Sequence, residues 1–192
     1  MKIAIVGATG AVGSHMLQDL EDLTDFSGKL TLFASRASKG KTRVFRGKTY
    51  TVEEFCPDRF GSYDFVLMSA GTSFSKQYSE KLAEKGCVVI DNSSAWRQKD
   101  HIPLVVPEVN GHLLSSCRQG IISNPNCVVI PLVTALKPLQ ENFGFDLVQV
   151  ATYQSVSGAG AKGVFELKQQ EKALVKQESL SPKVFPWQIL QA

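Results

Sequence analysis

The sequence of 192 residues predicts an α/β fold, a doubly wound and mostly parallel sheet followed by a shorter second region. Two observations predict the sheet. Apolar runs of strand length alternate with helical patterns from the N-terminus onward. These runs are nearly continuous, which is typical of parallel strands buried on both faces. A third observation, a glycine-rich turn between the first strand and the first helix, indicates what the sheet binds.

Each element of the first region follows from its own pattern. Strands are expected at 2–6, 29–35, 63–70, 87–90 and around 121–122, and amphipathic helices at 13–23 and 75–85. A short hairpin is expected at 44–53 around Arg46 and Gly47. Consecutive strand and helix patterns of this kind form parallel βαβ units.

The second region has a different character. A helix is expected at 128–143, one long alternating strand at 145–160 and a polar-faced helix at 162–176. We therefore place a domain boundary near residue 126, so that the chain comprises domains at 1–126 and 127–192.

The composition excludes several classes of function. Lys and Arg number 21 against 18 Asp and Glu, with no basic run, so charge gives no support for binding nucleic acid or a membrane surface. No apolar stretch approaches the roughly 20 residues of a membrane span. The four cysteines show no CxxC spacing. Free thiols in a reducing cytoplasm, without a metal site, are therefore expected.

The glycine turn predicts a dinucleotide site. Gly7 allows the tight turn, Gly10 lets the backbone approach a pyrophosphate, and Gly13 lets the helix pack against the strand. The spacing GxxGxxG departs from the GxGxxG fingerprint, but its place between a strand and a helix favours a Rossmann-type nucleotide-binding domain over a merely structural turn.

The end of the second strand predicts which nucleotide is bound. An NAD site places a carboxylate there to accept a hydrogen bond from the ribose 2′-hydroxyl. No carboxylate occurs at 33–40, where Ser35, Arg36 and Ser38 stand instead. Cations and hydroxyls suit a 2′-phosphate and favour NADP. The alternative is a solvated basic loop.

Cys127 is the candidate nucleophile. It stands directly before the helix expected at 128–143, and a helix N-terminus favours the reactive thiolate. Cys56, Cys87 and Cys117 lack this context and are interpreted as small buried side chains. A nucleotide fold with an activated thiol suggests hydride transfer to or from a thioester. None of the three histidines has a spacing that marks it as the general base.

Six motifs follow one another along the chain: GATGAVG (7–13), DNSSAWR (91–97), PLVVPEVN (103–110), SNPNC (123–127), ATYQSVSGAG (151–160) and FPWQI (185–189). With these motifs in this order, the chain resembles aspartate-semialdehyde dehydrogenases along its whole length. The resemblance implies NADPH-dependent reductive dephosphorylation of L-aspartyl-4-phosphate to L-aspartate 4-semialdehyde. That reaction lies on the route to lysine (through diaminopimelate), threonine and methionine. It also implies that 127–192 is the incomplete start of an α+β catalytic and dimerisation domain.

The resemblance also implies roles for individual residues. Cys127 would form the thioester, Gln154 would orient the substrate or the thioester, and Arg97 with Asn126 would bind the substrate's phosphate. Cofactor-binding residues would be Gly7, Thr9, Gly10, Ala11, Val12, Gly13, Ser35, Arg36, Ser38, Gly71, Thr72, Ser157 and Gly158. Without the resemblance, the alternative interpretation of Arg97 is a surface cation in a polar loop.

Two departures from the family pattern bear on the function. Ala37 stands where the family usually has Arg in the 2′-phosphate loop, with Arg36 as its neighbour. The sequence after 185–189 differs from the family's Ala-Phe-Asn, and the general base is expected beyond residue 192. The alternatives are a truncated, inactive NADP-binding fragment and an enzyme like N-acetyl-glutamyl-phosphate reductase, whose NPGCY motif differs at Asn126 and Val128. The partners expected are a small-molecule substrate and, for the family, a second subunit of a homodimer.

Overall fold

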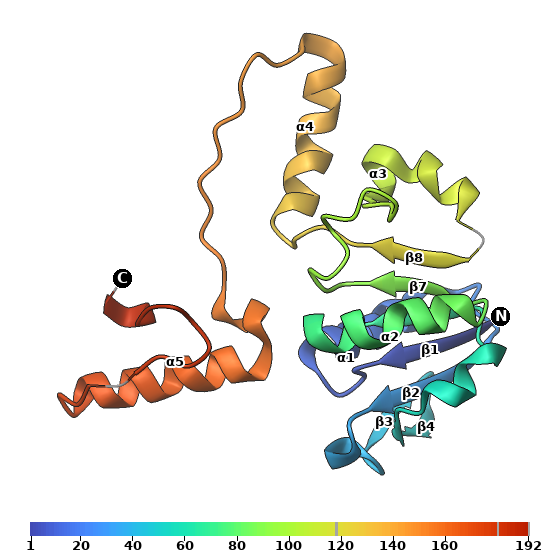
Figure 1. The fold of residues 1–192 in the computed structure, drawn as a ribbon, viewed down its shortest axis with the longest axis horizontal. Helices are drawn as coiled ribbons and strands as arrows, with labels where there is room; N and C mark the ends of the chain where they lie inside the picture. Colours follow the sequence, from blue (N-terminus) through green and yellow to red (C-terminus); the bar gives the residue numbers. More distant parts are fainter. Residues whose placement is uncertain (118, 180, 192) are drawn as a thin grey trace. The chain divides into compact units, whose positions relative to one another are not determined.

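The computed structural model describes residues 1–117, 119–179 and 181–191 (Figure 1). The chain divides into two compact units, Met1–Val148 and Gln149–Ala192. The domain boundary expected near residue 126 stays a prediction.

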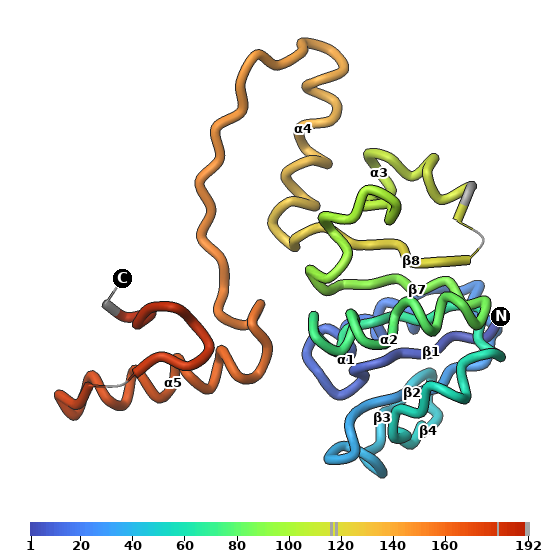
Figure 2. Tube along the Cα trace, viewed as in Figure 1, coloured from blue at the N-terminus to red at the C-terminus, as the bar shows by residue number. Residues whose placement is uncertain are grey.

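A parallel sheet forms the centre of the first unit, as predicted. Its strands are β1 (Lys2–Val6), β2 (Lys29–Ala34), β5 (Glu53–Glu54), β6 (Phe65–Met68), β7 (Val88–Asp91) and β8 (Gly120–Ser123). Their order is β5-β2-β1-β6-β7-β8, and every pair is parallel. The chain thus runs outward from β1 to β2 and then returns across the sheet to β7 and β8 (Figure 2). This reversal on either side of β1 is the doubly wound arrangement of a Rossmann-type fold.

Both faces of the sheet are buried. The helices are α1 (Ala11–Asp22), α2 (Thr72–Glu84), α3 (Pro107–Asn110) and α4 (Val129–Phe143), with 3-10 turns at Arg36–Ser38, Pro57–Ser62 and Gly111–Ser116. Ile5 of β1 packs in one core cluster with Leu17 of α1, whereas the next residue, Val6, packs in another with Leu82 of α2. Because successive side chains of a strand point to opposite faces, α1 and α2 cover opposite faces of the sheet.

The predicted hairpin is present, with shifted bounds. It consists of β3 (Thr42–Phe45) and β4 (Lys48–Thr51), which pair antiparallel. Arg46 and Gly47 both have positive φ, 49° and 72°, as a two-residue turn of type I′ requires. Glu53, which the sequence placed in the hairpin, belongs instead to the edge strand β5.

The second unit is organised around helix α5 (Gly160–Val175), which confirms the helix expected at 162–176. The 3-10 turns Val156–Ala159 and Ile189–Gln191 flank it. The carboxylate of Glu166, 6% exposed, accepts backbone N–H bonds from Lys183, Val184 and Phe185 at 2.7, 2.6 and 3.3 Å. Glu166 therefore ties the segment at 183–185 to the helix.

The prediction of one long strand at 145–160 is wrong. Residues 144–155 carry no strand pairing, 156–159 form a 3-10 turn, and α5 begins at 160. A strand exists only through the ladder of hydrogen bonds to a neighbour, and no described residue supplies one here. None of the helices in the described part of the chain has the length and apolarity that crossing a bilayer requires.

Candidate active site

Five loops of the first unit leave the sheet at the same edge. They follow β1, β2, β6, β7 and β8 at residues 7–10, 35–39, 69–71, 92–97 and 124–127. The register places Val6 beside Phe33 and Met68, and Asp91 beside Met68 and Ser123, so the strands end at one level. Ligands of open parallel sheets bind outside these carboxyl ends.

The glycine turn has the geometry that a dinucleotide site needs. Gly7 has φ +92°, and a Cβ there would lie 2.7 Å from the carbonyl oxygen of Ser69. A Cβ on Gly13 would lie 2.3 Å from the carbonyl oxygen of Gly7. Gly10 is exposed at the N-cap of α1, and the helix begins at Ala11, two residues earlier than predicted. The first N–H groups of a helix lack intrahelical acceptors, so the chain offers donors that suit a pyrophosphate.

The loop after β2 contacts the glycine turn. Thr9 Oγ1 donates to Ser38 Oγ at 3.2 Å, which brings together two side chains predicted to bind the cofactor. Ser35 and Arg36 are exposed, while Ser38 is buried. Lys39 pairs with Glu54 at 3.5 Å. Arg36 and Lys39, the two cations of this loop, are therefore both exposed, and Lys39 has a carboxylate partner.

The N-terminus of α2 lies at the same edge. Gly71, its N-cap residue, has φ +92°, a conformation that favours glycine. The hydroxyls of Thr72 and Ser94 are 3.1 Å apart, which connects the helix to the loop at 92–97.

Arg97 is held between two loops. Its Nε donates to the carbonyl oxygen of Asn124 at 2.8 Å, and its Nη2 donates to that of Asn92 at 3.0 Å. The side chains of Asn92 and Asn124 also contact each other. The guanidinium is half-buried. Two of its five N–H donors make these bonds, and they fix the plane of the group at the edge of the sheet.

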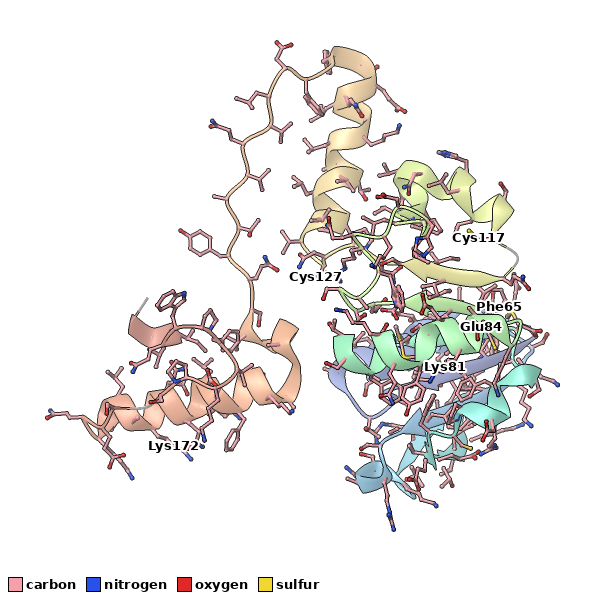
Figure 3. The ribbon with its side chains drawn as sticks, viewed as in Figure 1. Phe65, Lys81, Glu84, Cys117, Cys127 and Lys172 are labelled. Carbon is pink, nitrogen blue, oxygen red and sulfur yellow. The ribbon has the colours of Figure 1, made fainter. Side chains whose placement is uncertain are left out.

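Cys127 is exposed at the beginning of α4 (Figure 3). Asn126 Oδ1 accepts from the N–H of Val128 at 2.9 Å and lies 3.9 Å from Cys127 Sγ, while the Asn126 carbonyl accepts from Val129 N–H at 2.9 Å. Asn126 therefore shapes the turn that precedes the helix. The helix begins at Val129, one residue later than predicted, with Pro131 in its first turn, where proline is tolerated.

The remaining cysteines occupy different environments. Cys87 is buried, donates to the carbonyl oxygen of Phe60 at 3.0 Å, and burial raises the pKa of its thiol. Its interpretation as a core residue is confirmed. Cys56 and Cys117 are half-buried, so that interpretation is only partly correct for them.

Gln154, Ser157 and Gly158 belong to the second unit and are exposed. Gln154 Nε2 donates to Thr152 Oγ1 at 3.3 Å, and the Ser157 N–H donates to Ser155 Oγ at 3.3 Å. The first-unit side chains predicted to act together, around Thr9, Arg97 and Cys127, all come from loops at the one sheet edge.

Sequence reasoning missed a buried polar cluster beneath the loop at 92–97. It contains Ser75 and Ser79 of α2 with Asp91, the last residue of β7. An acidic residue that ends an otherwise apolar strand was the available signal, but its partners lie 12 and 16 positions away on a helix.

Comparison with known proteins agrees with this architecture. The family models for the semialdehyde dehydrogenase NAD binding domain and dimerisation domain match residues 2–117 and 136–192. The aspartate-semialdehyde dehydrogenase of Aquifex aeolicus is 48% identical over 98% of this chain and 56% of its own length. The chain thus spans just over half the length of such relatives.

Solved structures give the same result. The crystal structure of aspartate semialdehyde dehydrogenase II from Vibrio cholerae, complexed with ASA, has a TM-score of 0.85 and 42% identity, covering 98% of this chain and 56% of the other. The Candida albicans aspartate semialdehyde dehydrogenase with NADP has a TM-score of 0.63 and 27% identity, covering 74% of this chain and 47% of the other. By its sequence and its fold, the chain belongs to the semialdehyde dehydrogenase family.

Proposed function

We propose that this chain acts as an aspartate-semialdehyde dehydrogenase, which converts L-aspartyl-4-phosphate to L-aspartate 4-semialdehyde and phosphate. The observation that carries the proposal is the exposed thiol of Cys127 at the start of α4, at the sheet edge where the glycine turn also lies. The names of the relatives support this substrate over an N-acetylated glutamyl phosphate.

The first half of the reaction uses residues of the first unit. The Cys127 thiolate attacks the acyl carbon of the substrate, and phosphate leaves with the electron pair of the broken C–O bond, so that a thioester to Sγ remains. After reduction at the acyl carbon, the C–S bond breaks, the aldehyde leaves, and sulfur keeps the bonding pair.

Arg97 and Asn126 bind the phosphate group in this proposal. Arg97 is already held by two carbonyl oxygens, and its remaining N–H donors suit a planar, bidentate contact with an oxyanion. Asn126 precedes the thiol and shapes its turn. Gln154 orients the substrate, which is a role for the second unit.

NADP is the proposed cofactor, and bound NADPH would supply the hydride that brings the acyl group to the aldehyde level. The glycine turn from Gly7 to Gly13 would hold its phosphates, and Gly71 with Thr72 would lie beside it. Ser35, Arg36 and Ser38 would bind the 2′-phosphate. The absence of a carboxylate at 33–40 and the NADP in the Candida albicans structure support this choice over NAD. Ser157 and Gly158 would lie at the nicotinamide end.

Assembly and location complete the proposal. The match of residues 136–192 to a dimerisation domain supports a homodimer. The four cysteines are free thiols, which a reducing cytoplasm maintains. The reaction would serve the synthesis of lysine, threonine and methionine.

A single-turnover experiment tests the proposal without depending on a general base. The 192-residue chain is mixed with aspartyl phosphate, and intact-mass spectrometry and phosphate release are followed together. We expect one aspartyl group on Cys127 for each phosphate released, no adduct in Cys127→Ala, and an unchanged adduct in the control Cys117→Ala. Faster acylation by N-acetyl-glutamyl phosphate, or an adduct that survives in Cys127→Ala, would contradict the proposal.

A further inference from the structure

The polar cluster beneath the loop at 92–97 is fully enclosed. Ser75, Ser79 and Asp91 each have no solvent exposure. The hydroxyls of Ser75 and Ser79 both donate to Asp91 Oδ2, the second at 3.0 Å, and the two hydroxyl oxygens are 3.1 Å apart. Asp91 Oδ1 accepts from the N–H of Ser93 at 2.7 Å. A buried carboxylate requires such donors, because an unpaired one would be costly.

Ser75 differs from Ser79 in one contact. Its hydroxyl oxygen also accepts from Nε1 of Trp96, at 2.7 Å. The hydroxyl therefore donates to the carboxylate and accepts from the indole at the same time. Hydrogen bonds in such a chain strengthen one another in a low-dielectric interior. Ser75 is the residue through which Asp91 holds Trp96, whose side chain is 4% exposed.

The hydrogen bond between Trp96 and Ser75 fixes the C-terminal end of the loop at 92–97. Asp91 ends β7, and its carbonyl oxygen accepts from the N–H of Asn124 at 2.9 Å. Trp96 and Arg97 are the last two residues of the loop. The guanidinium of Arg97 donates to two carbonyl oxygens, one of Asn92, the first residue of the loop, and one of Asn124. The position of the guanidinium thus depends on both ends of the loop.

We propose that Ser75 is a positioning residue for phosphate binding. By joining Asp91 to Trp96 it holds the loop at 92–97 so that the Arg97 guanidinium keeps a fixed place at the sheet edge. The inference rests on the proposed function in one respect, that Arg97 binds the substrate phosphate. Ser75 itself touches neither substrate nor cofactor.

The neighbouring Ser79 provides a matched control. Ser75→Ala and Ser79→Ala each remove one buried hydroxyl from Asp91 on the same helix, but only the first removes the acceptor of Trp96. We measure the Kd for inorganic phosphate by calorimetry on the full chain in the presence of NADP, with the Kd for NADP alongside. Ser75→Ala should weaken phosphate binding about tenfold, since small misplacements of a binding group have effects of this size or larger. Ser79→Ala should change it less than about threefold, and neither should alter NADP binding.

A spectroscopic readout separates positioning from general destabilisation. The indole ¹H–¹⁵N resonance of Trp96 should move upfield in Ser75→Ala and stay in place in Ser79→Ala. Trp96→Phe, which removes the donor but leaves the Asp91 cluster intact, should reproduce the loss of phosphate affinity and serves if Ser75→Ala does not fold. Equal phosphate affinities for Ser75→Ala and Ser79→Ala would overturn the inference.

The variant Arg97→Ala separates the proposed phosphate-binding role of Arg97 from the positioning role of Ser75. If this variant binds phosphate as the parent chain does, the proposed role of Arg97 is wrong, and the inference built on it is wrong with it. If Arg97→Ala loses phosphate binding while Ser75→Ala and Trp96→Phe keep it, the proposed function stands and only the positioning role of Ser75 is overturned.

Discussion

Replacing Gly13 by alanine adds one methyl group at the tightest point of the glycine turn. A Cβ there would lie 2.3 Å from the carbonyl oxygen of Gly7, 2.8 Å from its carbonyl carbon and 2.9 Å from the Cα of Ala8. Favourable carbon contacts are about 3.5–4.0 Å. Helix α1 or the turn would therefore have to move by roughly an ångström.

The cost follows from two opposing terms. Overpacking a well-filled site destabilises a protein by about 1–3 kcal/mol, and the neighbours here are backbone atoms, which cannot rotate away. Alanine recovers about 1 kcal/mol over glycine inside a helix. With the upper end of the first term, the free energy of unfolding should fall by about 2 kcal/mol, a change of about 30-fold in the unfolding equilibrium. NADP affinity should fall as well, because the displaced turn is the proposed phosphate site.

Urea unfolding followed by circular dichroism measures this difference. The midpoint should drop without a change in the slope m, since the folded and unfolded surfaces stay the same. Gly61, in the 3-10 turn Pro57–Ser62, is the control, because a Cβ there meets nothing within 4 Å. Gly61→Ala should stay within about 0.5 kcal/mol of the parent chain. A Gly13→Ala chain as stable as the parent would refute the steric reasoning.

Three further predictions concern charged and titrating side chains. Burial opposes ionisation of Glu166, but the N–H donors of 183–185 outweigh it and lower the pKa of its carboxyl. Its contribution to stability is present above the ordinary value of 4.5 and is lost as the pH falls through the lowered pKa. In Glu166→Gln the melting temperature should therefore fall less as the pH is lowered into the acid range. An unchanged dependence of the melting temperature on acid pH would contradict this. Iodoacetamide should label exposed Cys127 well before Cys87, whose buried thiol has a raised pKa, as peptide mass spectrometry can establish. Equal rates would show that the thiols do not differ in access. Arg36→Ala should weaken NADP about tenfold more than NAD in direct titrations, the size of a charge-assisted contact. An equal loss for both nucleotides would argue against a 2′-phosphate contact.

Patterns within a few residues predicted the part of the fold that positions the site. The apolar run at 2–6 is strand β1, and the run at 87–90 predicted β7, which the structure places at Val88–Asp91. The glycine turn lies between a strand and a helix, as expected. The start of α1 at Ala11 was missed, because the apolar residues at helical spacing that predicted the helix begin only at Met16. The close approach of the Gly7 carbonyl explains why glycine stands at position 13.

Contacts between distant residues could not be predicted in the same way. The two residues of β5, Glu53 and Glu54, are acidic and have no strand pattern, yet they pair with Phe33 and Ala34 at the sheet edge. Likewise, Asp91 meets Ser75 across 16 positions of sequence. Such pairs depend on the assembled fold, which a local pattern does not contain.

The wrong strand prediction at 145–160 shows what an alternating sequence pattern can and cannot predict. Alternation of apolar and polar residues indicates two unlike faces, but a strand also needs a partner for its backbone N–H and C=O groups. In the described chain Leu147 is 75% exposed and Val150 is 53% exposed. These apolar side chains are therefore exposed, and a pairing partner for the backbone is what 144–155 lack among the described residues. The periodicity of a sequence identifies its apolar side chains, whereas the formation of a strand depends on a neighbouring strand that pairs with its backbone.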